Sequence, residues 1–598
     1  MKRLITLLLL TMFSISARAT FLTYDFIIGS YYYKITSENP KEVALVRNWD
    51  ACILYQGDIT VPDSVQHDGV YYKVTMIDEM VFYGAMINSL TLPKGIRSIG
   101  EECFADATFN CPISLPDSLR LIKKSAFFGA HCTGKLFIPA LCTTIEDGAF
   151  GLVYGLQQFN VDSANQAYSS HEGVLYNKDK TKLIQCPTEK QGIFTIPSGV
   201  ETIGNCAFEM SKLDSIIIPS SVSHLEVCAF SQCSRLRSIY IPSTVKHIDG
   251  GIFRGCVNLN NIVIDSLNSN YMVEDNIVYS INKDTLISHH SASDRVEILP
   301  TVKVIAQEAF TISNITSVVL PEGVEEIQDA AFRYTPYLYT VVLPQTLRKI
   351  GTSAFQQCNS LRIIEIPNSV VEMGDSVFLD CWNLLSVKMS DSIKIIPKKT
   401  FSYCYSLSIY TGGASVERIE HVAFMMCSNL PEEIVFPETL RYIGLGAFYE
   451  CGFKEVEFTG VVDTISGENF DFLRILVLQN STPPFTYNTK VANSIFKVSI
   501  PCGTKENYLA DPNWSSFSYR ERCDGVEEGE ENNVKVTSHY RSVEVLNAEG
   551  YSVAIYDVMG RCHASEGATG QNIRHYSLPT AGIYVVRVND KGYKVVVR

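Results

Sequence analysis

Leu236-Arg-Ser-Ile239-Tyr240-Ile241-Pro242-Ser-Thr-Val245-Lys-His-Ile248 is the stretch of sequence that decides the fold, and it leads into Ile252-Phe253-Arg-Gly-Cys256. The residues before the proline alternate as in a strand, with Ile239 and Ile241 on one face and Tyr240 on the other. Proline closes this strand because it has no N–H to donate to a ladder. We expect the segment around the phenylalanine to form a brief helical or turn-like return.

The same pattern recurs along most of the chain, and a phenylalanine marks each copy. The intervals between successive marking phenylalanines are 22, 23, 23, 58, 22, 23, 57, 22, 23, 23, 23, 23, 24 and 22 residues. One such unit cannot bury its own apolar face, but stacked units share a continuous core. The spacing therefore predicts a mainly β solenoid of about 23-residue repeats. The marking residues are Phe82, Phe104, Phe127, Phe150, Phe208, Phe230, Phe253, Phe310, Phe332, Phe355, Phe378, Phe401, Phe424, Phe448 and Phe470.

The two long intervals, of 58 and 57 residues, contain related insertions. Val161-Asp162-Ser163 with Tyr168 and Tyr176 matches Ile264-Asp265-Ser266 with Tyr271 and Tyr279 at a constant offset of 103. Asn177-Lys-Asp and Asn282-Lys-Asp supply turn residues. We predict a hairpin inserted into one coil near residues 160–190 and another near 263–293.

The repeat L-x-x-I-x-I-P-x-x-V-x-x-I-x-x-x-A-F-x-x-C resembles the BspA-type (Treponema-type) leucine-rich repeat of bacterial surface proteins. The resemblance covers roughly residues 59–480 and implies a curved leucine-rich-repeat solenoid over 73–480, preceded by an N-terminal β cap over 20–72. Ile500-Pro501-Cys502-Gly503, with Tyr508, Trp514 and Phe517, resembles the closing unit of such proteins, which implies a cap over 481–523. Adhesion or ligand binding is the role usually suggested for the family.

The N-terminus has the pattern of a secretory signal peptide over residues 1–19. Lys2 and Arg3 form the basic region, an apolar run follows, and Ala17-Arg18-Ala19 fits the cleavage rule, so that Thr20 would begin the mature chain. A transmembrane anchor is disfavoured because the apolar run is shorter than the ~20 residues that span a bilayer. We expect a secreted chain with no membrane span.

The C-terminal part changes pattern after the acidic run at 524–533, which is typical of an exposed linker. Strand-like segments at 543–546, 552–558, 573–578, 583–588 and 593–597 predict a small β-sandwich over 534–598. Val553 to Arg561, Gly582 to Val588 and Tyr593 to Arg598 resemble the type IX secretion C-terminal sorting domain of Bacteroidota. The resemblance implies the export machinery as a partner and an outer-membrane surface location. The alternative is an ordinary immunoglobulin-like accessory module.

Charge and motifs argue against several classes of function. The formal net charge is −14, and no basic cluster stands out that could neutralise nucleic acid or an anionic membrane. The sequence contains no His-Glu-x-x-His, G-x-S-x-G, phosphate-binding glycine loop or EF-hand motif. We therefore assign no catalytic residue, metal or cofactor and expect no enzyme. His289-His290 is interpreted as a solvated loop pair rather than a metal site.

The 18 cysteines fall into two informative groups. Those three residues after a marking phenylalanine would stack about one strand spacing apart, ~4.8 Å, with parallel Cβ directions that suit free thiols better than disulfides. Cys502 and Cys523 flank the closing unit, and the sequence leaves open whether they form a disulfide. The stacked group is Cys233, Cys256, Cys358, Cys381, Cys404, Cys427 and Cys451.

The candidate binding surface is the outward-facing strand position, the central residue of each I-x-I. An apolar run that ends in two charges is compatible with a binding patch, and equally with plain β-propensity. We expect the solenoid to bind an extracellular protein or matrix ligand. The alternatives are a surface scaffold without a specific ligand, or a glycan-binding protein or hydrolase with its site in an insert or at the solenoid edge. The strand-face residues are Phe137, Thr195, Ile217, Tyr240, Val263, Val319, Val342, Glu365 and Lys388.

Overall fold

The computed structural model of the chain forms two compact units, one of residues 1–393 with 397–413 and one of residues 394–396 with 414–598. The predicted signal peptide and the acidic linker lie outside the residues that the structure describes. The described residues are 24–47, 54–290, 294–470, 473–486, 497–523, 535–539, 542–546, 552–557, 561–567, 573–579, 582–588 and 591–597.

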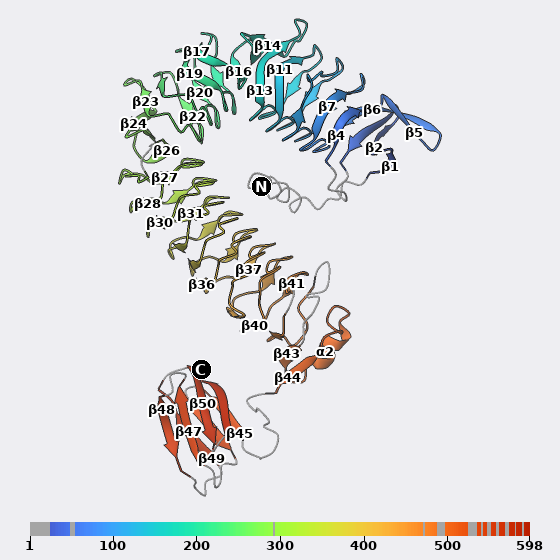
Figure 1. Cartoon of the computed structure of the whole chain (residues 1–598). Helices are drawn as coiled ribbons and strands as arrows, with labels where there is room; N and C mark the ends of the chain where they lie inside the picture. Colours follow the sequence, from blue (N-terminus) through green and yellow to red (C-terminus); the bar gives the residue numbers. More distant parts are fainter. Residues whose placement is uncertain are drawn as a thin grey trace. The chain divides into compact units, whose positions relative to one another are not determined.

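The first unit begins with an antiparallel cap that merges into the repeats (Figure 1). β1 pairs antiparallel with β2 and β2 with β3, whereas β3 pairs in parallel with β6, against which β5 lies antiparallel. β6 then pairs in parallel with the first short strand of the repeats. The cap strands are β1 (Phe26–Ile28), β2 (Tyr31–Glu38), β3 (Lys41–Val46), β5 (Ser64–His67) and β6 (Val70–Ile77).

Most coils contribute a strand just before the proline position to one side of the solenoid. These strands pair in parallel with the neighbouring coils and alternate between buried and exposed residues, as the I-x-I pattern predicts. We call these sheets the strand face. In the first unit the strand face comprises β4 (Gln56–Thr60), β7 (Met86–Thr91), β9 (Thr108–Phe109), β11 (His131–Ile138), β13 (Tyr154–Val161), β17 (Gln191–Thr195), β19 (Lys212–Ile217), β21 (Ser238–Ile241), β23 (Asn261–Ile264), β28 (Ser317–Val319), β30 (Thr340–Val342), β32 (Ile363–Glu365), β34 (Ser386–Met389) and β36 (Ile409–Gly412).

A second set of parallel ladders follows the proline, mostly with two residues per coil. One residue of each pair is usually buried, so these ladders close the core from the other side. They are β8 (Ser98–Ile99), β10 (Leu121–Ile122), β12 (Thr144–Ile145), β18 (Thr202–Ile203), β20 (His224–Leu225), β22 (His247–Ile248), β27 (Val304–Ile305), β29 (Glu326–Ile327), β31 (Lys349–Ile350) and β33 (Glu372–Met373).

The marking phenylalanines form stacked columns inside the coils. Phe230 is fully buried between Phe208 and Phe253, with ring centroids 5.5 and 5.7 Å away. The return around each ring is a turn rather than a helix, because the residues two before and two after the ring have positive φ in each copy from Phe82 to Phe448. That region is costly for β-branched side chains, yet Ile312 and Val422 occupy it.

The stacked cysteines are buried free thiols, as the sequence indicated. Burial raises the pKa of the Cys358 thiol to about 12, so the thiol keeps its proton. It donates to the carbonyl oxygen of Phe332 at 3.1 Å, and Thr335 donates to Phe310 in the same way. The equivalent thiols of Cys233, Cys256, Cys381, Cys404 and Cys451 lie 2.9 to 3.2 Å from a phenylalanine carbonyl oxygen. A small hydrogen-bond donor therefore suits this position.

Each insertion contains one hairpin more than predicted. β14 (Tyr168–His171) pairs antiparallel with β15 (Val174–Asn177), which pairs antiparallel with β16 (Lys182–Gln185). The second insertion repeats this with β24 (Tyr271–Glu274), β25 (Ile277–Ser280) and β26 (Thr285–His289). The last strand of each insertion then pairs in parallel with the next short ladder.

The second unit first continues the repeat pattern, which ends in a cap before the C-terminal sheets. Its strands are β35 (Ile395–Ile396), β37 (Arg418–Ile419), β39 (Tyr442–Ile443) and β41 (Thr464–Ile465) on one side, and β38 (Glu433–Phe436), β40 (Glu455–Phe458), β42 (Ile475–Val477), β43 (Lys497–Pro501) and β44 (Tyr519–Arg522) on the other. The helix α2 (Lys505–Ala510) connects β43 to β44 and buries Tyr508.

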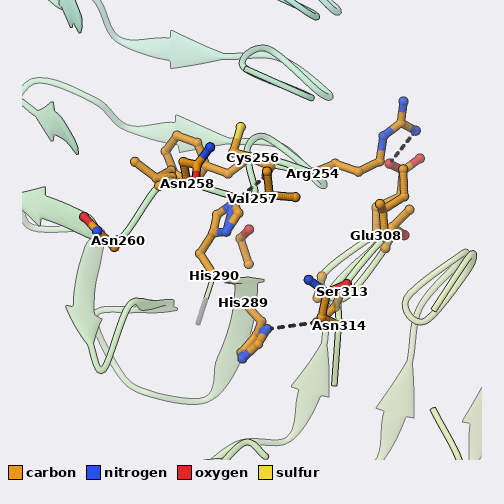
Figure 2. A pocket seen from close by; sticks show the side chains of 17 residues that line it. Arg254, Cys256, Val257, Asn258, Asn260, His289, His290, Glu308, Ser313 and Asn314 are labelled. Atoms are coloured by element: carbon orange, nitrogen blue, oxygen red, sulfur yellow. Dashed lines mark hydrogen bonds and ion pairs between the residues drawn. The ribbon is translucent and has the colours of Figure 1, made fainter. Parts of the chain in front are cut away.

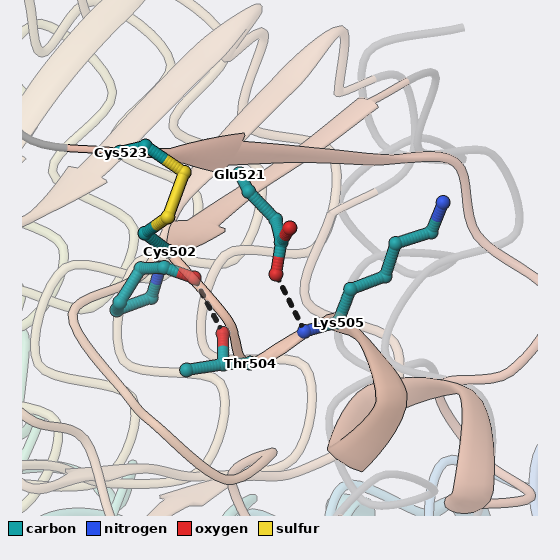
Figure 3. Close-up of a disulfide and its surroundings, with 6 residues drawn as sticks. Cys502, Thr504, Lys505, Glu521 and Cys523 are labelled. Atoms are coloured by element: carbon teal, nitrogen blue, oxygen red, sulfur yellow. Dashed lines mark hydrogen bonds between the residues drawn. A yellow bond between two sulfur atoms is a disulfide. The ribbon is translucent and has the colours of Figure 1, made fainter.

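The structure joins Cys502, directly after β43, to Cys523, directly after β44, in a disulfide with their Cα atoms 4.4 Å apart (Figure 3). Beside it, Thr504 donates to the carbonyl oxygen of Pro501 at 2.7 Å, and the Lys505 N–H donates to a Glu521 carboxylate oxygen at 2.9 Å. The disulfide thus links the strand before α2 to the strand after it.

The C-terminal segment contains two antiparallel sheets that share one buried apolar cluster. Strands lie at each of the five predicted positions. Two further strands, β45 and β48, carry mostly polar residues that gave no strand pattern in the sequence. The first sheet is β45 (Lys535–His539), β46 (Ser542–Leu546) and β49 (Ile573–Ser577), and the second is β47 (Val553–Asp557), β48 (Cys562–Glu566), β50 (Gly582–Val588) and β51 (Lys591–Val597).

Candidate functional site

All nine predicted strand-face residues are exposed on the strands where the sequence placed them. They do not form one sheet, because the strand face of the first unit is divided into several sheets. Thr195 pairs with Ile217, Tyr240 with Val263 and Val319 with Val342 across neighbouring strands. The longest uninterrupted run is Val319, Val342, Glu365 and Lys388 on one five-stranded sheet, β28-β30-β32-β34-β36.

That sheet carries more exposed apolar side chains than the sequence reasoning identified. Ile363 lies two residues before Glu365 on the same face of β32, and Ile409 occupies the equivalent position on β36. The signal for them was strand alternation itself, since residues two apart share a face. We define the strand-face patch as the exposed residues Val319, Tyr339, Val342, Ile363, Leu385 and Ile409.

Part of the strand-face patch lines a depression of about 710 Å³. Tyr339, Val342, Ile363 and Leu385 line it together with polar side chains. Arg362 lies over the Tyr339 ring, with its guanidinium carbon 5.7 Å from the ring centroid. Glu365 and Lys388 form an exposed ion pair at 3.6 Å on one flank. The depression therefore combines apolar surface with an orienting polar margin, as protein interfaces do.

A second hollow, which we call the insert pocket, lies beside the second insertion (Figure 2). Its volume is about 290 Å³, and it separates the coil of Phe253 from residues 308–314 of the coil of Phe310. His289 and His290 line it, and both are largely enclosed. The interpretation of these histidines as a solvated loop pair is therefore wrong. His289 ends β26 and stacks on Phe310 at 5.0 Å, because this strand pairs back into the solenoid.

The histidines of the insert pocket are electrically neutral at pH 7. Burial lowers the pKa of His289 to about 4, and burial together with the charge of His289 lowers the pKa of His290 to about 3. His289 Nδ1 lies 3.3 Å from the Ser313 hydroxyl, and His290 Nε2 contacts the carbonyl oxygen of Phe253. His289 Nε2 is buried and has no hydrogen-bond partner among the described residues.

A buried charge cluster forms one wall of the insert pocket. Arg254 lies 3.0 Å from a carboxylate oxygen of Glu209 and 3.4 Å from one of Glu308, and its Nε donates to Ser231 at 3.2 Å. Burial raises the pKa of the fully enclosed Glu209, and the charge of Arg254 opposes that rise. Arg254 thus ties together four coils, those of Phe208, Phe230, Phe253 and Phe310.

The buried histidines make the stability of the first unit depend on pH. In the unfolded chain His289 titrates near 6.5, whereas in the folded chain it stays neutral down to about pH 4. The unfolded state therefore binds more protons below pH 6.5, and the free energy of unfolding falls as the pH falls. We predict that His289 alone accounts for a loss of about 2 kcal/mol between pH 7.5 and pH 5, measured by urea unfolding.

The first insertion supplies the control for this prediction. Cys186 occupies the position that matches His289 at the offset of 103. The variant His289→Cys should remove this part of the pH dependence, whereas His171→Asn, at an exposed site, should keep it. Parallel stability profiles for wild type and His289→Cys would contradict the assignment.

The described residues lack two features that would indicate a metal site or a membrane protein. Among them, no three or more His, Cys, Asp or Glu side chains come together in a way that could hold a metal ion. Within the same part of the chain, no helix has the length and apolar character needed to cross a membrane.

Known proteins resemble the chain at the level of the repeat. A leucine rich cell surface protein from Faecalibacterium prausnitzii A2-165 is 22% identical to it, covering 64% of this chain and 94% of that one, with a TM-score of 0.35. A leucine-rich repeat protein from Bacteroides ovatus ATCC 8483 is 19% identical, covering 83% of this chain and 100% of that one, with a TM-score of 0.32. The pneumococcal vaccine antigen PcpA is 15% identical, covering 83% of this chain and 98% of that one, with a TM-score of 0.35. No curated protein matches the chain.

The family model described as "BspA type Leucine rich repeat region" matches residues 75–193, 186–283, 279–408 and 394–499. These matches cover the repeats of both units and well over half of the chain. They include the stacked phenylalanines, the strand face from β7 onward and both insertions described above. The chain therefore belongs to the family of proteins with a BspA-type leucine-rich repeat region.

Proposed function

We propose that this protein is exported to the cell surface and binds an extracellular protein or matrix component through the strand-face patch. The observation that carries the proposal is a set of six exposed apolar side chains on or directly before the strands of one continuous sheet, four of which (Tyr339, Val342, Ile363 and Leu385) line one depression. Contiguous exposed apolar surface marks interaction sites more often than single exposed residues do. The family match fits a cell-surface protein, and the repeat solenoid fits a non-enzymatic scaffold.

The chemistry of the patch suits a protein partner. Isoleucine and leucine supply apolar contact area. Arg362 stacked on Tyr339 supplies a planar cation on an aromatic ring, and arginine and tyrosine are both enriched at binding hot spots. The ion pair of Glu365 and Lys388 is exposed on both sides, so it contributes little to stability. On the rim of an interface the same pair would set orientation and the rate of association.

Export is the second part of the proposal. The basic, apolar and small-residue regions of residues 1–19 support removal of a signal peptide. The two sheets of residues 535–597 share one apolar cluster, which supports a small β-sandwich that serves as a type IX sorting domain. The segment Tyr593 to Arg598, with its basic residues Lys594 and Arg598, supports the same assignment.

Export is tested on intact cells, and binding is tested with the purified chain. Protease shaving followed by mass spectrometry should recover solenoid peptides from the surface, with a mature N-terminus at Thr20. The purified chain should bind saturably to immobilised extracellular-matrix or epithelial surface proteins. Binding should weaken at least tenfold in Val342→Glu and in Ile363→Glu, because either change buries a charge in the interface; tenfold is about 1.4 kcal/mol.

The matched control is Val435→Glu, which alters another exposed valine, on β38 of the second unit. It should leave binding unchanged. Tyr240→Glu and Phe137→Glu test whether the neighbouring sheets of the strand face take part. Equal binding by wild type, Val342→Glu and Ile363→Glu would reject the patch, and solenoid peptides found only inside cells would reject export.

A further inference from the structure

The depression on the strand face holds one cation that the protein itself leaves unpaired. Arg362 is exposed directly before β32, and no carboxylate or other acceptor among the described residues pairs with its guanidinium. The guanidinium carbon lies 5.7 Å from the centroid of the exposed Tyr339 ring, a cation–π contact that holds the planar group over the neighbouring coil. The group is therefore oriented, while its N–H donors stay open to a partner.

The charges that line the depression do not balance. Three charged side chains line it, and two of them, Glu365 and Lys388, form an ion pair at 3.6 Å. Arg362 therefore leaves the depression with one excess positive charge, whereas the whole chain has a formal net charge of −14. An anionic group of a partner would meet a local positive charge on an otherwise acidic protein, which is the charge complementarity that selects partners at interfaces.

Apolar side chains surround this cation. Tyr339, Ile363 and Leu385 are exposed, and all three line the same depression as Arg362. A partner's apolar residue would cover them and remove water from around the guanidinium, which strengthens a charge-assisted hydrogen bond. Arginine presents its N–H donors as a planar fork that matches a carboxylate. The depression thus suits a carboxylate with an apolar residue beside it.

We propose that the strand-face patch recognises an acidic peptide segment of its partner, in which a glutamate or aspartate pairs with Arg362 and an adjacent apolar side chain enters the depression. This rests on the proposed function and names the chemistry of the protein that the patch would bind. A nucleic acid or a sulfated glycan needs several unpaired cations in a row. Only one of the charges that line the depression is unpaired, which fits a single carboxylate.

Saturation-transfer NMR and calorimetry on the full chain test this with short peptides whose termini are blocked. The peptides alternate leucine with glutamate, with glutamine or with lysine. The glutamate peptide should bind saturably. The glutamine peptide has nearly the same shape without the charge and should bind about tenfold more weakly, as expected when a hydrogen bond to a charged group is lost. The lysine peptide should bind more weakly still, because it brings a like charge to Arg362.

Variants of Arg362 locate the effect. Arg362→Gln should weaken binding of the glutamate peptide about tenfold and leave the glutamine peptide nearly unchanged, a difference that a general loss of structure would not produce. Arg362→Lys should lie between, because it keeps the charge but loses the fork and the stacking on the ring. The matched control is Arg237→Gln, since Arg237 follows Leu236 as Arg362 follows Leu361, is also exposed and lies outside the depression. It should bind as wild type does.

Several results would overturn the assignment. They are the absence of saturable binding by the glutamate peptide, equal binding of the glutamate and glutamine peptides, wild-type binding by Arg362→Gln, and displacement of the glutamate peptide by heparin. A dimer in sedimentation that Val342→Glu dissociates would also overturn it, because the occupant would then be a second copy of the chain. The two proposals can fail separately. If Val342→Glu loses binding to surface proteins while Arg362→Gln keeps it, the patch stands and only the acidic partner is rejected.

Discussion

Replacing Phe230 by alanine should lower the free energy of unfolding of the first unit by roughly 3–5 kcal/mol. The ring is fully buried and stacked between Phe208 and Phe253 at 5.5 and 5.7 Å. Its loss removes apolar burial and leaves a cavity that the neighbouring coils cannot close, because their own rings are held by the same stack. Urea or thermal unfolding of the purified variant measures the effect.

Tyr240→Ala provides the matched control, because it truncates an aromatic ring on the next strand of the same region at an exposed position. Its effect should stay within about 0.5 kcal/mol, as for most surface changes. Equal losses for the two variants would mean that the stacked column does not carry the core. The comparison separates burial from the loss of an aromatic ring as such.

The repeat explains why so much of the fold follows from the sequence. The column of stacked rings needs one buried ring from each coil. The spacing alone therefore identified the marking phenylalanines from Phe82 to Phe470. The strand before each proline follows from alternation, and Ile239 and Ile241 are buried while Tyr240 is exposed, as predicted. The sequence predicted that the stacked thiols are free, but it did not predict that they act as hydrogen-bond donors. Their hydrogen bonds to phenylalanine carbonyl oxygens depend on backbone geometry that no residue pattern reveals.

The features that sequence reasoning missed share a physical cause. His289 seemed part of a solvated loop because it stands beside His290 in an insertion, yet strand pairing carries it into the core beside Phe310. Ile363 and Leu385 were not predicted as part of the binding surface, because neither occupies the central position of the I-x-I pattern. Arg254 belongs to a buried charge cluster because Glu209 and Glu308, which are distant from it in sequence, lie beside it in the fold. Such long-range contacts leave no periodic signal.

The hydrogen bonding between neighbouring coils also determines which groups are open to a binding partner. Regular coils satisfy one another's backbone groups, so their sides offer only side chains to a partner. The second insertion breaks that regularity and opens the insert pocket, where the N–H groups of Phe253 and Gly255 have no acceptor among the described residues. The strand face and the pocket therefore differ in kind. The strand face carries exposed apolar side chains, whereas enclosed histidines and a charge cluster line the pocket.

Arg254→Met should destabilise the first unit by roughly 3–5 kcal/mol, the usual cost of removing one partner from a buried ion cluster. The variant would leave Glu209 fully buried and Glu308 largely buried without their cation. The deficit should shrink as the pH falls, because burial already raises the pKa of Glu209 and its protonation would remove the uncompensated charge. Urea unfolding at several pH values measures both effects.

Two comparisons make the Arg254 prediction specific. Arg237→Met removes an exposed arginine from the neighbouring coil and should cost little. Adding Glu209→Gln and Glu308→Gln to Arg254→Met should recover much of the loss, because no buried charge then remains unpaired. Hydrogen exchange should show loosening of both residues 206–210 and 308–312 in Arg254→Met, since Arg254 links these coils across the second insertion. If exchange rises only at one coil, or if Arg237→Met costs as much, the cluster does not join the solenoid across the insertion.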